Sequence, residues 1–331
     1  MEIKDLAGIS EPLKRLIEVI AEGVGAVSRP YLIKKSAEAK AYEIQVISQA
    51  MAESRNLLGG TDYEDGKIKI LASSETPSQL LSLPERATTR SEYQELRKQQ
   101  NIESVCANAA EKLAGESEIP EDKPEPEWLN HFFDIAEKIS AEDLQYWWGK
   151  ILAGEIKKPG SFSLRTLETL KNISRQEAES FVKLGQYVLD TKSMTFFLEP
   201  QEYIFKKNNT LNFSDILALK EAGLVTDSDF LSFSFEASTA GTTTYLFYGS
   251  LVLLLEREQD TPEIDNRVGV LTKAGTELMK LISIQPDMEY VKFVTQKFNR
   301  EGMKIAWAPV LREEEGSIHI GDKTYLTTDP G

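Results

Sequence analysis

The stretch EPEWLNHFFDIAEKISAEDLQYWWGKILAGEIKKPGSFSLRTLETLKNISRQEAESFVKLGQYVL, residues 125–189, decides the fold of the chain. It holds three of the four tryptophans, and helix start signals and a Pro-Gly break divide it into four short helices. Each of these helices is too short to be stable alone, because helix nucleation is costly and few turns follow it. The four helices are therefore expected to share one core, as a short-helix bundle over residues 128–190.

Serine residues followed three positions later by an acidic residue mark where these helices begin. Ser140 with Asp143 predicts an acidic capping box, and Ser174 with Glu177 predicts a regular one. Ser163 is the expected N-cap of the third helix, which follows the Pro-Gly break. These helix start signals are a more specific feature of the stretch than its tryptophans.

The loop between the second and third helices is the best candidate for a contact surface. Two lysines and a capping serine stand just before a helix N-terminus, where backbone N–H groups can hold an anion or a partner carboxylate. A solvated turn is the alternative for the same residues. Adjacent helical residues point about 100° apart, so one of the paired tryptophans is expected in the core and the other nearer the surface. The candidate surface consists of Lys157, Lys158, Ser161, Arg165 and Trp148, with Glu155 beside them.

The chain before this block is predicted to be helical. Residues 1–28 hold an amphipathic helix, with apolar residues at three- and four-residue steps from Ile9 to Val27, which would pack on the body, on a partner helix or on a membrane surface. Residues 29–114 indicate a long helical hairpin with an inserted loop, containing a short strand, at 59–83. Helices of this composition also form coiled coils between chains. Residues 115–127 are a predicted acidic linker.

Aromatic and β-forming residues dominate the chain after this block. A helix over 213–222, a hairpin over 230–255 around Gly241 and a helix introduced by LTKAG follow one another in the order of a winged helix. Residues 191–312 are therefore predicted as a winged-helix-like α+β domain, and 313–331 as a polar tail. The predicted fold class is mainly α with a smaller α+β part: a helical hairpin, a short-helix bundle and a C-terminal winged-helix-like domain.

Composition limits the classes of function. The chain has 331 residues, 41% of them hydrophobic, which is enough for two or three domains with cores of their own. A formal charge of −15 disfavours a large phosphate footprint, because Lys and Arg dominate affinity for nucleic acid. The single cysteine, Cys106, cannot form an intrachain disulfide. No apolar run approaches the roughly 20 residues of a spanning helix, so we expect a cytoplasmic protein.

The sequence predicts no catalytic, cofactor-binding or metal-binding residue. Cys106, His131 and His319 cannot supply a four-ligand zinc site within one chain. Residues 60–68, GTDYEDGKI, have the wrong spacing for a phosphate loop, and Gly23-Val24-Gly25 lacks the third glycine of a dinucleotide fingerprint. His131 could act as a general base, although a lone histidine is more typical of a surface or core edge. Dispersed carboxylates leave an enzyme of unfamiliar type as an open alternative.

Parts of the chain resemble the DUF2806 family of uncharacterised bacterial proteins. The resemblance covers most of the chain from Arg29 onward and is most specific over 148–162. More loosely, the chain resembles the Abi-alpha type of helical protein associated with phage defence. The DUF2806 family implies no reaction, so it assigns no catalytic residue here. The segments that resemble it are RKQQNIESV (97–105), WWGKILAGEIKKPGSFSLRTLETLKNISRQEAESFVKL (147–184), EAGLV (221–225) and LTKAGTEL (271–278).

These observations predict a non-enzymatic oligomerising or partner-sensing scaffold, with the resemblance implying a role in bacterial anti-phage defence. A homo-oligomer or a protein partner is expected. One alternative is a winged-helix DNA-binding regulator, against which the acidic charge speaks, as does the single cation, Lys220, of its predicted recognition helix. The other alternative is a peripheral membrane effector that acts through Ile9 to Val27.

Overall fold

The computed structural model describes residues 10–24, 61–64, 67–70, 82–116, 118–198, 203–207, 211–228, 231–235, 241–258, 264–299, 303–314 and 317–326. The chain divides into two compact units, Met1–Ser161 and Phe162–Gly331. The first arm of the predicted helical hairpin, residues 29–58, lies outside the described residues.

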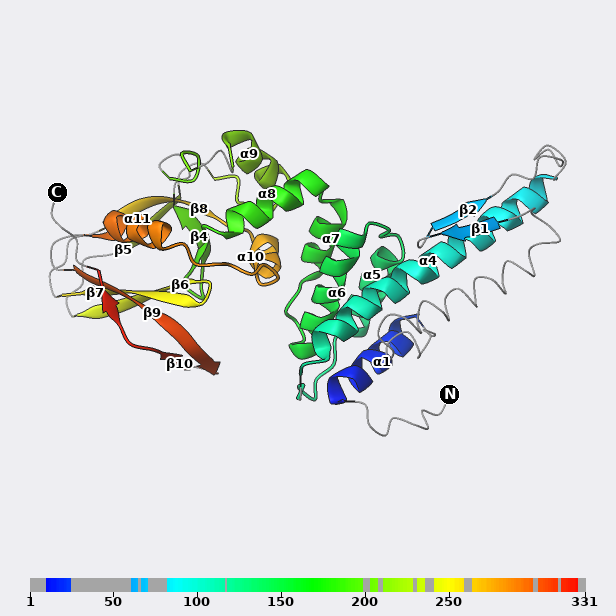
Figure 1. The fold of residues 1–331 in the computed structure, drawn as a ribbon, viewed down its shortest axis with the longest axis horizontal. Helices are drawn as coiled ribbons and strands as arrows, with labels where there is room; N and C mark the ends of the chain where they lie inside the picture. The colour runs from blue at the N-terminus through cyan, green and yellow to red at the C-terminus, as the bar shows by residue number, and fades with distance from the viewer. Residues whose placement is uncertain are drawn as a thin grey trace. The chain divides into compact units, whose positions relative to one another are not determined.

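The first unit is a bundle of helices. Figure 1 shows α4 as its longest helix, with α5 and α6 beside the C-terminal part. α4 and α6 pack closely at Gly149, where an added Cβ would lie only 2.4 Å from the Cβ of Asn108. Within the segment predicted as an inserted loop, two short strands form an antiparallel pair. The elements are α1 (Glu11–Val24), β1 (Thr61–Glu64), β2 (Lys67–Ile70), α4 (Leu83–Leu113), α5 (Pro126–Ala136) and α6 (Glu142–Lys157).

Aromatic rings fill the core of this bundle. Trp128 stacks on Phe132 with ring centroids 5.0 Å apart, and Phe132 in turn lies 5.2 Å from Trp148. Trp148 is fully buried and Trp147 is half-buried. The prediction that one tryptophan of the pair fills the core and the other lies nearer the surface is therefore confirmed.

Two buried amide side chains join α4 to the turn between α5 and α6. The Asn101 amide donates to the carbonyl of Glu137 at 2.8 Å, and the Gln145 amide donates to the carbonyl of Ile139 at 2.8 Å and to the Asn101 side-chain oxygen at 3.2 Å. An unpaired buried amide would destabilise the fold, so these bonds fix which parts of the helices face each other.

The predicted capping boxes have different outcomes. The one at Ser140 is wrong: α6 begins after Ala141, and the Ser140 hydroxyl instead accepts a hydrogen bond from Arg97 at 2.8 Å. The one at Ser174 is confirmed, because its hydroxyl accepts from the Glu177 N–H at 3.2 Å and its own N–H donates to the Glu177 carboxylate at 2.6 Å. A tertiary partner for the side chain of Ser140 thus replaced the local cap.

α1 packs its apolar face inside the first unit. Leu16, Val19 and Ile20 are buried, and the helix contacts α4, α5 and α6. Of the surfaces that the amphipathic pattern allowed, the body of the protein is the one that α1 contacts in this structure. A membrane contact through the same residues would require α1 to leave this core.

The segment predicted as an acidic linker lies along the polar face of α1. The Arg15 guanidinium donates to the carbonyls of Glu121 and Asp122 at 3.0 and 3.3 Å, and Lys123 pairs with Glu18 at 3.1 Å. Pairs of this exposure contribute little individually, but together they hold the segment against the helix.

The second unit contains a large antiparallel sheet with helices around it (Figure 1). Its strand order is β10-β9-β7-β6-β3-β4-β8-β5, and β11 also pairs with β9. Its helices are α7 (Leu164–Asn172), α8 (Arg175–Gly185), α9 (Phe213–Glu221), α10 (Lys273–Met279) and α11 (Met288–Phe298). Its strands are β3 (Leu189–Asp190), β4 (Thr195–Leu198), β5 (Leu231–Phe235), β6 (Thr242–Tyr248), β7 (Leu251–Arg257), β8 (Ile264–Val270), β9 (Met303–Glu314), β10 (Ser317–Ile320) and β11 (Thr324–Tyr325).

The predicted fold class is wrong for this part of the chain. A nine-stranded antiparallel sheet replaces the winged-helix-like domain. The hairpin predicted around Gly241 is also wrong, because β5 pairs with β8, whereas β6 pairs with β7 through a turn at Gly249. The run Leu251–Leu255 is buried throughout, as in a central strand covered on both faces, so it lacks the alternation that marks a two-stranded wing. β10 and β11 lie in the segment predicted as a polar tail.

A tyrosine cluster attaches α11 to the sheet. The buried Tyr290 hydroxyl donates to the carbonyl of Tyr187 at 2.7 Å, and the Tyr248 hydroxyl donates to the carbonyl of Gln186 at 2.8 Å. Burial raises the pKa of Tyr248 to about 12 and the pKa of Tyr290 well above its ordinary value. Both hydroxyls therefore stay protonated and donate these bonds at neutral pH.

We expect Leu16→Ala to lower the free energy of unfolding by about 2–5 kcal/mol, because it removes buried methyl groups and leaves a cavity in the bundle. Leu311→Ala is the control, since Leu311 is 68% exposed, and it should change stability by less than about 0.5 kcal/mol. Urea denaturation without lipid, followed by tryptophan fluorescence, measures both. Equal effects of the two variants would contradict the placement of α1 in the core.

Candidate functional site

The surface predicted from the sequence falls in both units. Lys157, Lys158 and Ser161 belong to the first unit together with Trp148, and Arg165 belongs to the second. Trp148 is fully buried, so its side chain contributes to the core of the bundle. The two parts of the predicted surface are therefore described separately.

A buried carboxylate closes the lysine-containing loop of the first unit. Glu155 is only 2% exposed, and its carboxylate accepts a hydrogen bond from the N–H of Gly160 at 2.6 Å. The Ser161 hydroxyl donates to the carbonyl of Lys158 at 2.6 Å, and Lys157 forms an ion pair with Glu116. Lys158 is exposed. The loop is thus a closed turn, with Lys158 as its outward-facing cation.

The predicted anion site at the start of α7 is filled by the chain itself. Glu277 of α10 is 6% exposed, and its carboxylate accepts from the Ser163 N–H at 2.7 Å, the Ser163 hydroxyl at 3.0 Å and the Thr166 hydroxyl at 2.5 Å. The sequence indicated an anion or a partner carboxylate at this helix start, and backbone N–H groups there favour a negative charge. Its partner is an intramolecular residue.

Arg165 lies at an acidic recess of the second unit. The recess has a volume of about 450 Å³. Its lining includes Glu168, Glu177 and Glu221 beside Arg165. These carboxylates oppose binding of an anion by the arginine, so the recess does not extend the predicted anion site.

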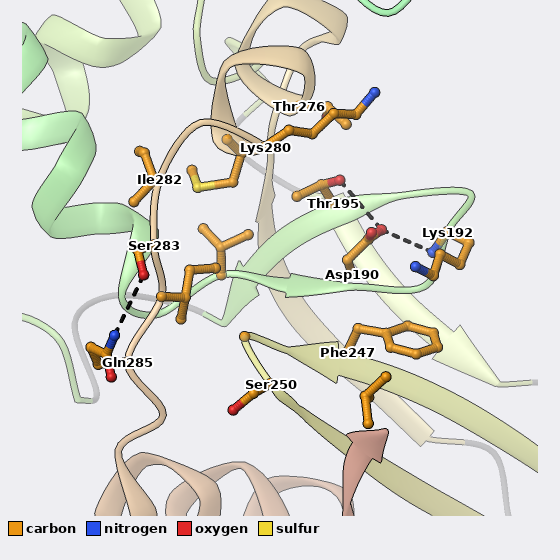
Figure 2. Close-up of a pocket in the computed structure, with 15 residues that line it drawn as sticks. Asp190, Lys192, Thr195, Phe247, Ser250, Thr276, Lys280, Ile282, Ser283 and Gln285 are labelled. Carbon is orange, nitrogen blue, oxygen red and sulfur yellow. Dashed lines mark hydrogen bonds between the residues drawn. The ribbon is translucent and has the colours of Figure 1, made fainter. Parts of the chain in front are cut away.

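A larger cavity, of about 570 Å³, opens in the second unit (Figure 2). Its walls come from the β3–β4 hairpin, the β6–β7 turn, the end of α10 with the segment after it, and Val310 of β9. Five of its lining residues are aliphatic or methionine. They are Val188, Met279, Ile282, Ile284 and Val310.

The β3–β4 hairpin gives the cavity a charged side. One Asp190 carboxylate oxygen accepts from the backbone N–H of Lys192 at 2.9 Å and from the Thr195 hydroxyl at 3.4 Å, as the dashed lines of Figure 2 show. The Lys192 ammonium lies 4.3 Å from the ring centroid of Phe247. Lys280, from the end of α10, is a second lysine in the lining.

Lys192 has an unusual backbone conformation. Its φ is 71°, and among the described residues it is the one non-glycine residue with a positive φ. Side chains other than glycine, asparagine and aspartate rarely adopt this region, because Cβ approaches the following carbonyl oxygen. The two hydrogen bonds of Asp190 hold the turn in this shape.

The lining of the cavity mixes apolar, charged and neutral polar groups. It combines an apolar wall, two ammonium groups, one carboxylate and the polar groups of Ser250, Thr276, Ser283 and Gln285. The volume of the cavity lies in the range of small-molecule sites, but its lining is more polar than is usual for them. In the described part of the chain, no group of three or more His, Cys, Asp or Glu could hold a metal ion. Burial raises the pKa of the Cys106 thiol, so that side chain is a poor nucleophile.

Sequence reasoning missed this cavity because its residues come from four separate segments. Asp190 precedes, and Lys192 lies within, a turn that has no glycine or asparagine, the usual signal of a left-handed residue. Lys280 sits in a helix that the sequence predicted only as part of a wing. The signal that could have helped is the polar turn DTKSMT between two apolar segments, which indicates a tight hairpin.

These observations define a two-unit α+β protein whose second unit carries an amphipathic cavity in a sheet-based framework. The chain belongs to the DUF2806 family: the model described as "protein of unknown function (DUF2806)" matches residues 85–295, more than half of the chain. The family resemblance drawn from the sequence is thereby confirmed. No curated protein and no solved structure matched the chain. The looser resemblance to Abi-alpha proteins stays a prediction. Among the described residues, no helix is long and apolar enough to cross a membrane.

We expect Glu155→Ala to lower the free energy of unfolding by about 1–3 kcal/mol, because it leaves the N–H of Gly160 without its acceptor. Lys158→Ala, in the same turn, is the control and should change stability by less than about 0.5 kcal/mol. Chemical denaturation measures both variants. A neutral Glu155→Ala would show that the buried carboxylate does not hold the turn.

Proposed function

We propose that this protein is a non-enzymatic scaffold that self-associates through the N-terminal half of α4. The observation that carries the proposal is the exposure of that half. Residues 83–97 are exposed, apart from the half-buried Thr89, whereas the buried residues of the same helix all lie between Asn101 and Leu113. A helix segment that leaves its own core for several turns is typical of helices that pair with another chain.

Two apolar residues of this segment have the spacing of one a/d pair, although the adjacent a and d positions, Arg86, Thr89, Gln100 and Glu103, are polar. Tyr93 and Leu96 are 42% and 49% exposed and lie three residues apart, which is the spacing of positions a and d in a heptad. Both lie on the side of α4 away from Ile102 and Leu113, which face the bundle. A second copy of α4 would bury both side chains.

Charged residues flank this seam with opposite signs. With Tyr93 at position a, Glu85 and Glu92 occupy position g, and Arg90 and Arg97 occupy position e. In a parallel pair, position g of one helix lies opposite position e of the next heptad of the other helix. Glu85 of one copy then faces Arg90 of the other, and Glu92 faces Arg97. Arg97 also donates to Ser140 within its own chain, which fixes the base of the segment.

The two alternatives drawn from the sequence have less support. DNA binding through a winged helix loses its structural basis, because the second unit contains a nine-stranded sheet in place of a winged helix. Peripheral membrane binding through α1 would have to expose Leu16, Val19 and Ile20, which are buried in the bundle. The scaffold is proposed to act in the cytoplasm, in line with the composition.

Tyr93→Glu combined with Leu96→Glu should convert the protein from a dimer to a monomer, because it places charges in the proposed seam. Sedimentation velocity over a range of concentrations measures the mass. The matched control is Tyr245→Glu with Leu217→Glu, whose parent side chains are 46% and 41% exposed in the second unit. The control should leave the mass unchanged. A wild-type chain that is monomeric throughout would rule out self-association.

A charge reversal tests the parallel register. Glu92→Arg places two arginines opposite each other and should weaken dimerisation, whereas Glu92→Arg with Arg97→Glu restores opposite charges and should recover it. Pairs of this kind contribute about 0.2–1 kcal/mol each, so the two symmetric pairs should shift the dissociation constant by up to about thirtyfold. Because Arg97→Glu also removes the bond to Ser140, its thermal stability is measured alongside, and failure to recover affinity at wild-type stability would contradict this register.

The defence role is part of the proposal and rests on the looser resemblance. Cells that express the wild-type chain should plate a panel of phages less efficiently than cells with an empty vector. The Tyr93→Glu, Leu96→Glu variant, expressed at the same level, should lose this protection if association is required. Equal plating on all three strains across the panel would overturn the defence role without bearing on self-association.

A further inference from the structure

We propose that the 570 Å³ cavity of the second unit is a binding site for a small organic anion with an apolar body. The site is separate from the α4 segment and goes beyond the scaffold function. Its volume lies within the range of about 300–1,000 Å³ that is typical of small-molecule sites. Its residues come from elements that the sheet holds in place, as Figure 2 shows for the two hairpins.

The charges that line the cavity favour an anion. Lys192 and Lys280 come from the β3–β4 hairpin and the end of α10, so they approach the cavity from two elements. The one carboxylate, Asp190, already accepts two hydrogen bonds from its own hairpin. The lining therefore carries two ammonium groups against one carboxylate that is engaged in holding the turn. Two lysines with the hydroxyl of Thr276 suit an anionic headgroup.

The apolar wall of the cavity indicates that the ligand has an apolar body beside its anionic group. Met279, Ile282 and Ile284 follow one another along the segment that leaves α10, and Val188 and Val310 come from the sheet side. An inorganic anion would leave this wall unused, whereas a hydrocarbon chain or ring bound to the anionic group would cover it. The combination of wall and lysines therefore indicates an organic anion.

The strained turn at Lys192 is the second, independent observation. A residue held at a φ of 71° by the hydrogen bonds of Asp190 carries a side chain that lies over Phe247 at the cavity. Glycine would adopt this backbone conformation without strain. Unfavourable backbone conformations of this kind concentrate at ligand-binding sites, where the position of one side chain matters.

Titration of the full-length protein with octanoate by isothermal calorimetry tests the proposal. Octanoate should bind, and 1-octanol and octylammonium, which share its apolar body, should bind at least about tenfold more weakly. Lys192→Gly removes the side chain and the strain together, so it should weaken octanoate binding about tenfold without loss of thermal stability. Lys280→Gln should weaken binding to a similar extent.

Lys292→Gln is the matched control, because Lys292 is an exposed lysine of α11 that does not line the cavity. It should bind octanoate as the wild type does. The proposal is overturned if octanoate does not bind, if 1-octanol binds equally well, or if both cavity variants bind like the wild type. Sedimentation of the same cavity variants should show the wild-type mass, so this result and the scaffold proposal can fail independently.

Discussion

The hydrogen bonds of the Glu277 carboxylate fix the packing of α10 against α7 in the second unit. The carboxylate is buried, and it accepts three hydrogen bonds from Ser163 and Thr166 at the first turn of α7, so that α10 and α7 are joined by a charged acceptor at a helix N-terminus. Such a position favours a negative charge, and hydrogen bonds to a charged group are stronger than those between neutral groups. Lys273 of α10 lies 3.8 Å from the other carboxylate oxygen, and the three donors of α7 satisfy the buried one, so the two helices constrain each other.

The other end of α10 is fixed in the same way. The Thr272 hydroxyl accepts from the N–H of Gly275 and donates to the carbonyl of Gly223, and an added Cβ at Gly275 would lie 2.1 Å from the carbonyl oxygen of Leu224. Two of the segments that carry the family resemblance, EAGLV and LTKAGTEL, therefore meet in space. Because both ends of this short helix are held, its last turn presents Met279 and Lys280 to the cavity.

Sequence reasoning predicted local features and failed on distant pairing. The capping box at Ser174 and the burial of one tryptophan of the Trp147-Trp148 pair follow from neighbours within a few residues, and both are observed, although the buried one is Trp148, which was predicted as part of the contact surface. The sheet depends on pairings such as β3 with β6 and β5 with β8, which no local pattern encodes. The anion site at the start of α7 shows the same limit, since the sequence indicated a carboxylate partner but not that Glu277, more than 100 residues later, supplies it.

Glycine would adopt the backbone conformation at position 192 at a lower cost than the lysine that stands there. The left-handed conformation costs about 1–2 kcal/mol for a residue with a Cβ. The hydrogen bond from its N–H to Asp190 does not select lysine, because glycine would donate the same bond. The contact with Phe247 does depend on the ammonium group, yet at an exposed site such a contact contributes about 0.5–1 kcal/mol. The contact with Phe247 is thus smaller than the conformational cost, and under the proposal above an anion bound beside Lys192 would add an interaction that glycine could not make.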